Sequence, residues 1–145
     1  MSAESNRKGV ERYFAEMINK NQLDLAERMM TPDIFYHGPI NVVQGLAAVK
    51  GWLGEWQAAF PDCLYAVDYI VGDDHRAMCR AVMRGTHHNA FRGVAATGRK
   101  VALPTAFSVQ FAGELIKDIE AFYDTRLLFE QLGVALPPAM KISRD

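Results

Sequence analysis

Four long stretches rich in β-branched and aromatic residues occupy the second half of the chain and constrain its fold more than any other feature. Val, Ile, Phe and Tyr favour extended strands, whereas Gly and Asp favour the turns between them. The stretches span residues 63–72, 75–87, 99–111 and 115–123, and turn-forming sequences at 72–74, 93–98 and 113–114 separate them. The pattern predicts four consecutive, long antiparallel strands.

The first half of the chain has helical periodicity instead, with apolar residues recurring at spacings of three and four. One face of a first helix is expected to carry Val10, Tyr13, Phe14, Met17 and Ile18. A short second helix, with Leu25, Ala26, Met29 and Met30 on one side, is expected to end at Pro32, before a brief strand over 33–37. A third helix is predicted from about Gly45 to Phe60, and a last short one over 125–132, before Gly133.

Helices followed by a meander of strands predict an α+β fold, in which the helices pack on one face of a curved antiparallel sheet. A bent sheet wrapped over helices encloses a pocket, and concave apolar pockets are the usual ligand sites. No repeat or linker is visible, so residues 1–145 are expected to form one domain, with short tails at 1–5 and 137–145.

Charge and motif content exclude several classes of function. The 16 basic and 17 acidic residues give a net charge of -1 without any basic block, which argues against nucleic-acid or membrane-surface partners. The N-terminus has no apolar stretch of the kind found in signal peptides, so a cytoplasmic protein is expected. Cys63 and Cys79 are isolated from one another and from histidines, and no metal, nucleotide or flavin motif occurs, so no cofactor is expected.

Two adjacent histidines stand in the segment GTHHNAF, residues 85–91. Side chains alternate along a strand, so His87 shares the small, apolar face that is expected to point inward, while His88 points outward. His87 is then either a pocket residue or a buried histidine bonded to the backbone. His37, before Gly38-Pro39, could likewise serve at the pocket mouth as an acid, a base or a hydrogen-bond donor, or be a turn residue.

Asp124 is the most informative carboxylate. It follows the apolar run that ends in Phe122-Tyr123, where partial desolvation would raise its pKa toward values useful for general acid–base catalysis. It also directly precedes the last predicted helix, where aspartate is a favoured N-cap, so both roles stay open. Glu120 lies on the same strand and is either a pocket residue or a solvated surface residue.

Large aromatic side chains from several predicted elements could line the pocket, although most aromatic residues are expected to be core. The candidates are Tyr13, Phe35, Trp52, Trp56, Phe107 and Tyr123.

The order of these segments resembles the SnoaL-like polyketide cyclase family of the nuclear-transport-factor-2-like superfamily. The resemblance covers about residues 8–134 and rests on FPD at 60–62, GTHHNAFRGVAATGRKV at 85–101 and YDTRLLFEQLG at 123–133. It implies a cone-shaped fold with a deep pocket, a homodimer formed through the outer sheet face, and cofactor-free ring closure by intramolecular aldol condensation. Asp124 is the position most similar to the family's acid–base aspartate, and His87 and His37 resemble its histidines.

Three hypotheses about function follow. In the first, a cyclase or isomerase acts on a hydrophobic or aromatic, carbonyl-containing molecule: Asp124 moves the proton, His87 or His37 binds the carbonyl oxygen, and the aromatic residues and Glu120 contact the substrate. In the second, the same fold is a non-catalytic ligand-binding or oligomerisation module. In the third, it is a small hydrolase in which Glu120 and Asp124 activate a water molecule.

Overall fold

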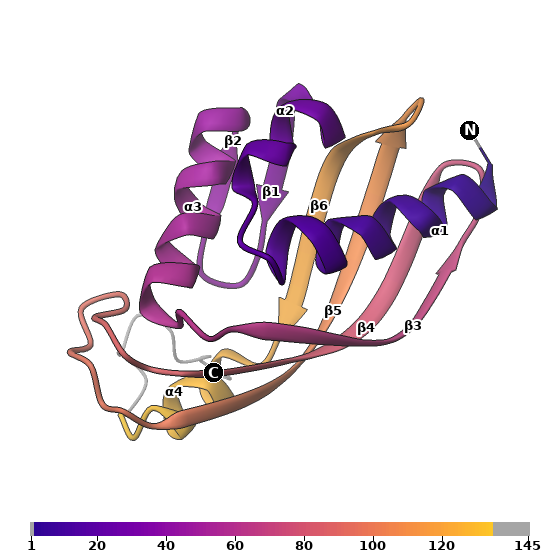
Figure 1. Ribbon diagram of the computed structural model, residues 1–145. Helices are drawn as coiled ribbons and strands as arrows, with labels where there is room; N and C mark the ends of the chain where they lie inside the picture. The colour runs from indigo at the N-terminus through magenta and orange to yellow at the C-terminus, as the bar shows by residue number, and fades with distance from the viewer. Residues whose placement is uncertain (1, 135–145) are drawn as a thin grey trace, which may run out of the picture.

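A six-stranded curved sheet in the order β2-β1-β6-β5-β4-β3 forms the framework of the protein (Figure 1). The computed structural model describes residues 2–134. Its strands are β1 (Met30–His37), β2 (Val42–Gln44), β3 (Leu64–Gly72), β4 (Arg76–Thr86), β5 (Lys100–Ala112) and β6 (Leu115–Tyr123). Its α-helices are α1 (Ala3–Arg12), α2 (Ala26–Met29), α3 (Leu46–Ala59) and α4 (Thr125–Gln131).

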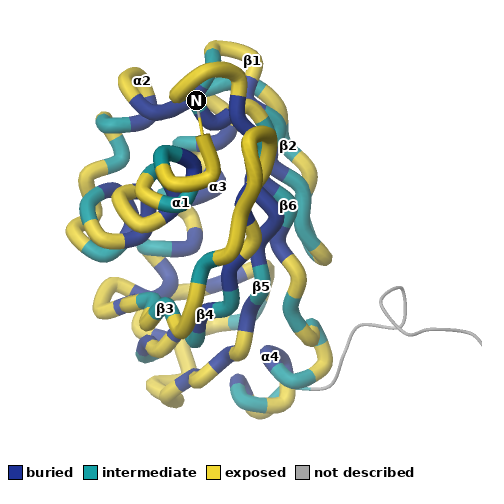
Figure 2. The backbone as a smooth tube through the Cα atoms, turned by 90° about the vertical axis from the view of Figure 1, so that its right-hand side faces the viewer, coloured by how far each residue is buried: buried dark blue, intermediate teal, exposed yellow. Residues whose placement is uncertain are grey.

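The helices α1 and α3 lie on one face of the sheet, which Figure 2 shows edge-on. The inner face of β4 shows why they pack there: Ala77, Cys79, Ala81 and Met83 are buried, while Met78 and Arg84, on the alternate face, are exposed. Small side chains on that face let the helices approach closely, and the buried apolar area stabilises the contact. The predicted α+β class, the four long strands and the helices over one sheet face are thus confirmed.

The sheet is mixed rather than purely antiparallel, which corrects one part of the prediction. Strand β1 pairs in parallel with β6, with Phe35 opposite Asp118 and His37 opposite Glu120, whereas the other neighbours pair antiparallel. Parallel neighbours need a long crossover connection, and here α3 and four strands, β2 to β5, provide it. The pairing of segments so distant in sequence leaves no local signal, and the three-residue strand β2 was also not predicted.

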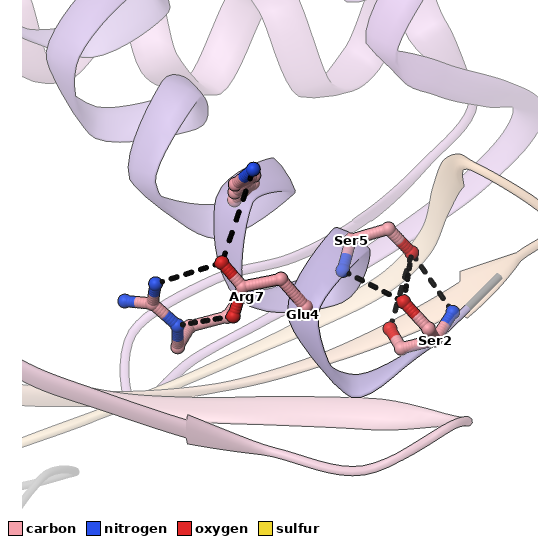
Figure 3. Close-up of polar contacts among 5 residues, drawn as sticks. Ser2, Glu4, Ser5 and Arg7 are labelled. Carbon is pink, nitrogen blue, oxygen red and sulfur yellow. Dashed lines mark hydrogen bonds and ion pairs between the residues drawn. The ribbon is translucent and has the colours of Figure 1, made fainter.

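The N-terminus of the chain is helical from Ala3, so the short tail expected at residues 1–5 is wrong. Ser2 and Ser5 form a capping box, in which the Ser2 side chain accepts a hydrogen bond from the Ser5 amide at 3.0 Å (Figure 3). An ion pair between Glu4 and Arg7 lies on the exposed side of the same turns. The tail expected at 137–145 lies outside the described residues.

The first helix changes to π-helical geometry over Tyr13–Ile18, directly where it faces the sheet. Insertions of this kind re-aim side chains and occur often at functional sites. The segment is followed by Asn19, whose side chain accepts from the amide of Tyr65 at 2.8 Å and donates to its carbonyl at 2.9 Å. This two-point contact fixes the end of the helical segment against β3.

Pro32 does not end the second helix, contrary to the prediction. The helix stops at Met29, and Pro32 lies inside β1, where the pairing with β6 shifts register between Met30 and Phe35. Proline lacks an amide hydrogen and is tolerated in a sheet at such an irregularity.

Among the described residues, no helix combines the length and the apolar character that a membrane-spanning helix requires.

Candidate functional site

A narrow, mainly apolar cavity lies between the π-helical segment, α3 and the concave face of the sheet. The cavity is tightly enclosed by side chains, and the volume open to the centre of a water molecule is only about 30 Å³. The total empty volume between the lining atoms, which includes the opening to solvent, is about 530 Å³. The lining consists of Tyr13, Phe14, Ile18, Tyr36, Gly38, Trp52, Leu53, Trp56, Gln57, Tyr65, Phe107, Ala121 and Tyr123.

Three polar atoms in this lining are buried without a hydrogen-bond partner of good geometry: the indole Nε1 of Trp56, the amide oxygen of Gln57 and the hydroxyl of Tyr123. The Trp56 indole also lies near the Cys63 thiol and opposes in part the rise in its pKa. Buried polar groups in proteins are nearly always paired, so an unpaired one calls for an explanation. The amide nitrogen of Gln57 donates to the carbonyl of Ile18 at 3.0 Å, which fixes the side chain with its oxygen free. The ring centroids of Trp56 and Tyr123 are 6.1 Å apart, so the two rings that carry these groups are neighbours.

The tyrosine hydroxyls of the cavity are neutral over the physiological range. Burial raises the pKa of Tyr36 and Tyr123 above the usual value for a phenol, and it raises the pKa of Tyr13 and Tyr65 further. A neutral phenol donates a hydrogen bond but does not remove a proton from carbon. Among residues 2–134, no carboxylate or imidazole belongs to the cavity lining. The lining can therefore bind and polarise an oxygen atom, while a base must come from elsewhere.

Five of the aromatic residues that the sequence indicated as candidates line this cavity: Tyr13, Trp52, Trp56, Phe107 and Tyr123. Phe35 and Glu120 do not. Phe35 alternates with the inward-facing Tyr36 along β1, and its ring lies 4.7 Å from the ring of His37. Glu120 alternates with Ala121 along β6, so strand geometry directs its side chain to the outer face. Their contact with substrate remains a prediction.

His37 lies on the outer face between two carboxylates. Its Nε2 is 3.1 Å from Asp118 Oδ1, and its Nδ1 is 3.6 Å from Glu120 Oε2. The parallel pairing of β1 with β6 brings these groups together. Its side chain therefore lies on the opposite side of the sheet from the cavity, although Gly38, the next residue, lines it.

His87 points inward, as strand alternation predicts, and its side chain is fully buried. Its Nδ1 accepts from the amide of Thr97 at 3.2 Å, which assigns the proton to Nε2. Burial lowers the pKa of His87, an effect that the backbone of Asn89 partly opposes. The imidazole is thus neutral and packs 5.6 Å from the ring of Phe60, behind the cavity wall. His88 is exposed, as predicted.

Asp124 caps the last helix, one of the two roles that the sequence allowed. Its Oδ1 accepts from the amide of Leu127 at 3.1 Å, and the residue is exposed. Asp124 follows Tyr123, the last residue of β6 in the cavity lining, but is not itself part of it. The acid–base roles of Asp124, His87 and His37 remain predictions.

Replacing Asp124 by alanine is expected to lower the free energy of unfolding by about 1 kcal/mol, because the Leu127 amide loses its acceptor. Asparagine retains an acceptor oxygen, so Asp124→Asn should keep most of that stability. Urea unfolding of the three proteins measures the difference. Equal losses for the alanine and asparagine variants would show that the charge, rather than the cap, stabilises this end of the helix.

The two cysteines are free and buried. Burial raises the pKa of each thiol to about 12, so neither is a thiolate at neutral pH and neither has the character of a nucleophile. Within residues 2–134, no three His, Cys, Asp or Glu side chains are grouped so as to hold a metal ion.

Sequence reasoning missed Tyr36, Tyr65 and Gln57 as parts of the cavity lining. Tyr36 could have been found, because it follows the buried Ile34 at the two-residue spacing of one strand face. Gln57 carried no such signal. Its position one residue after Trp56 on α3 becomes meaningful only when the helix packs against the π-helical segment.

The N-terminal helices packed on a curved sheet around an apolar cavity define the nuclear-transport-factor-2-like fold. The family model for the SnoaL-like polyketide cyclases matches residues 8–132, and the chain belongs to that family. No curated protein matches the chain at a significant level.

Solved structures with the same fold span more than one proposed activity. A proposed SnoaL-like polyketide cyclase from Jannaschia sp. CCS1 has a TM-score of 0.83 and 22% identity, with 94% of this chain and 95% of that one covered. IdmH, a proposed polyketide cyclase from Streptomyces antibioticus, has a TM-score of 0.74 and 25% identity, covering 88% and 97%. AclR from Streptomyces galilaeus, a proposed hydroxylase, has a TM-score of 0.76 and 25% identity, covering 90% and 97%.

Proposed function

We propose that this protein binds a small, flat, carbonyl-containing molecule in the cavity and promotes its cyclisation or isomerisation through an enol or enolate. The observation that carries the proposal is the set of unpartnered polar groups in an apolar cavity, with Trp56 and Tyr123 both able to donate. Donors aimed at the oxygen that gains charge stabilise an enolate most strongly where water is excluded. Family membership supports chemistry of this class.

In this mechanism the ketone oxygen accepts hydrogen bonds from the Tyr123 hydroxyl and the Trp56 indole, which acidifies the carbon next to the carbonyl. A base removes a proton from that carbon. The enolate carbon then attacks a second carbonyl of the same molecule, and the protonated base returns the proton to the new alkoxide; in an isomerisation the base returns the proton to another carbon instead. Asp124 is the base proposed from the sequence, and its position next to Tyr123 makes it the carboxylate to test first. The predicted aldol step needs no cofactor.

The test is proton exchange, which reports enolisation whether or not a ring can close. Methyl 4-acetylbenzoate incubated with the protein in D₂O should lose its acetyl methyl signal in proton NMR faster than in buffer alone. Ala121→Leu, which fills the cavity from β6, is the control and should abolish the acceleration. Loss of exchange in Asp124→Asn, with the fold intact, would identify the base.

Other results favour the other hypotheses. Binding of the ketone to the wild-type protein without accelerated exchange would support the non-catalytic binding module. Exchange that persists unchanged in Ala121→Leu would place the chemistry outside the cavity and contradict the proposal. The hydrolase hypothesis has less support, because the side chains of Glu120 and Asp124 do not converge on the cavity.

We also propose that the protein forms a homodimer through the outer sheet face. Large apolar side chains gather there on β3, β4 and β6, which is unusual for a surface facing water. They include Tyr69, Val71, Met78 and Phe122, which are 58%, 59%, 42% and 45% exposed, and they border one shallow groove. A second copy presenting the same patch would cover all four.

Met78→Glu is therefore expected to convert a dimer into a monomer, because it places a charge at the centre of this apolar patch. Size-exclusion chromatography with light scattering measures the mass directly. Val42→Glu is the matched control, since it adds the same charge at an exposed apolar residue on the distant strand β2. A wild-type protein that is already monomeric would overturn this proposal.

A further inference from the structure

A second, open groove adjoins the cavity. It is formed by the turn between β1 and β2, by α4 and by the segment that joins β4 to β5. Figure 1 shows that this last segment lies beside the lower end of α3. Gly38 lines both the cavity and the groove, so the two spaces meet at this residue. The groove lining consists of Gly38, Pro39, Ile40, Asn41, Val42, Arg92 and Phe129.

Arg92 is the only charged side chain in the lining of either space, both of which lie within the described residues. Its guanidinium lies 4.9 Å from the ring centroid of Trp52, which faces the cavity, and its Nε is 3.1 Å from Glu55 Oε1. The stacking and the ion pair together hold the cation at the junction of the two spaces.

The backbone of Arg92 has an unfavourable conformation, which indicates that its side chain has a role other than packing. Its φ of +47° lies in the left-handed region, which costs energy for a residue other than glycine. The neighbouring Gly93 has a φ of +82° without that cost. The turn therefore places a long cationic side chain at a position where conformational preference alone would favour glycine or asparagine.

We infer that Arg92 selects a ligand that carries an anionic oxygen, such as a carboxylate, at the end opposite the carbonyl group. The inference rests on the proposed function: the carbonyl end binds in the cavity, and the anionic end reaches the groove. A carboxylate is complementary to the planar guanidinium, which can donate two parallel hydrogen bonds. The Glu55 carboxylate pairs with the Arg92 guanidinium in the free protein, so a ligand carboxylate has to compete with Glu55 for the guanidinium.

The charge of Arg92 also reaches the cavity. It favours ionisation of the Tyr123 hydroxyl, opposing in part the larger effect of burial on the pKa of that group. A positive charge felt at Tyr123 is also felt by an oxygen bound to Tyr123. Neutralisation of Arg92 by a bound carboxylate would weaken that field, so this residue acts in recognition rather than as a catalytic residue.

Calorimetric titration with two matched probes tests the inference. The probes are 4-acetylbenzoate and its neutral methyl ester, which differ only in the charge at the end opposite the ketone. The wild-type protein is expected to bind the acid about tenfold more tightly than the ester, as for a charge-assisted hydrogen bond in a partly exposed site. The preference should shrink in high salt, because the groove is open to solvent.

Three variants make the test specific. Arg92→Gln should remove the preference for the acid, so that the acid and the ester bind with similar affinity. Glu55→Gln should increase the preference, because the competing carboxylate is gone. Arg28→Gln, which removes the same charge from exposed α2, should change nothing.

Equal binding of acid and ester by the wild-type protein, or a preference that survives Arg92→Gln, would overturn the role of Arg92 and leave the cavity proposal intact. If neither probe binds, both this inference and the proposed ligand class are wrong. The ester's behaviour therefore separates the two failures.

Discussion

Tyr123→Phe is expected to slow the exchange of the ketone's methyl protons by about 10²-fold, the typical effect of removing one donor from an oxyanion-binding site. The hydroxyl is buried and has no partner in the protein, so it is free to donate to a bound carbonyl oxygen. Its raised pKa keeps it protonated through the neutral and mildly alkaline range, so this contribution should not vary with pH there.

The stability of Tyr123→Phe separates a functional hydroxyl from a structural one. Deleting a buried group that makes no hydrogen bond in the free protein relieves a desolvation cost, so the free energy of unfolding should stay equal or rise. Tyr69→Phe, which removes a hydroxyl from the exposed outer face, is the matched control and should leave exchange unchanged. Unchanged exchange in Tyr123→Phe would exclude this hydroxyl as the donor.

Trp56→Ala is expected to cause the largest loss of stability, about 3–5 kcal/mol, as for other buried aromatic residues reduced to alanine. Its indole lies 5.2 Å from the ring of Phe91, 5.3 Å from that of Phe60 and 6.0 Å from that of Trp52. Its replacement by alanine would remove the side chain that packs against these three rings and also lines the cavity. Chemical unfolding monitored by circular dichroism measures the loss.

Trp56→Phe distinguishes packing from hydrogen bonding at the same position. Phenylalanine keeps most of the aromatic contact area but has no N–H, so it should recover much of the stability and still slow proton exchange. Full exchange activity in Trp56→Phe would show that Tyr123 alone binds the carbonyl oxygen. A loss of stability equal to that of alanine would show that the phenylalanine ring cannot fill the indole's place.

Much of the architecture was predictable because local sequence patterns determine it. Alternation along the predicted strand 75–87 placed His87 inside and His88 outside, and the helical spacing from Val10 to Ile18 predicted a buried face. The pattern could not reveal the change to π-helical geometry within that face, nor the continuation of β1 through Pro32. Both depend on what the segment packs against rather than on its own preferences.

The candidate site was less predictable than the fold. Tyr13, Trp52, Trp56, Phe107 and Tyr123 were proposed for the cavity because they are large and aromatic, and they do line it. The polar candidates were chosen for their chemistry and their place in the predicted elements, and their side chains lie outside the cavity lining: His37 beside two carboxylates, His87 against Phe60 and Asp124 on a helix cap. Chemical type does not encode the direction in which a side chain points.

The sequence by itself determined the class of fold, the order of its elements and the aromatic character of its interior, because hydrophobic periodicity and turn residues act over a few neighbours. Only the tertiary structure decided which polar groups share the cavity. The parallel pairing of β1 with β6 directs His37 and Glu120 outward, leaving Tyr36, Tyr123, Trp56 and Gln57 around the empty space. That selection follows from strand register and helix packing between segments far apart in the chain, which no local pattern records.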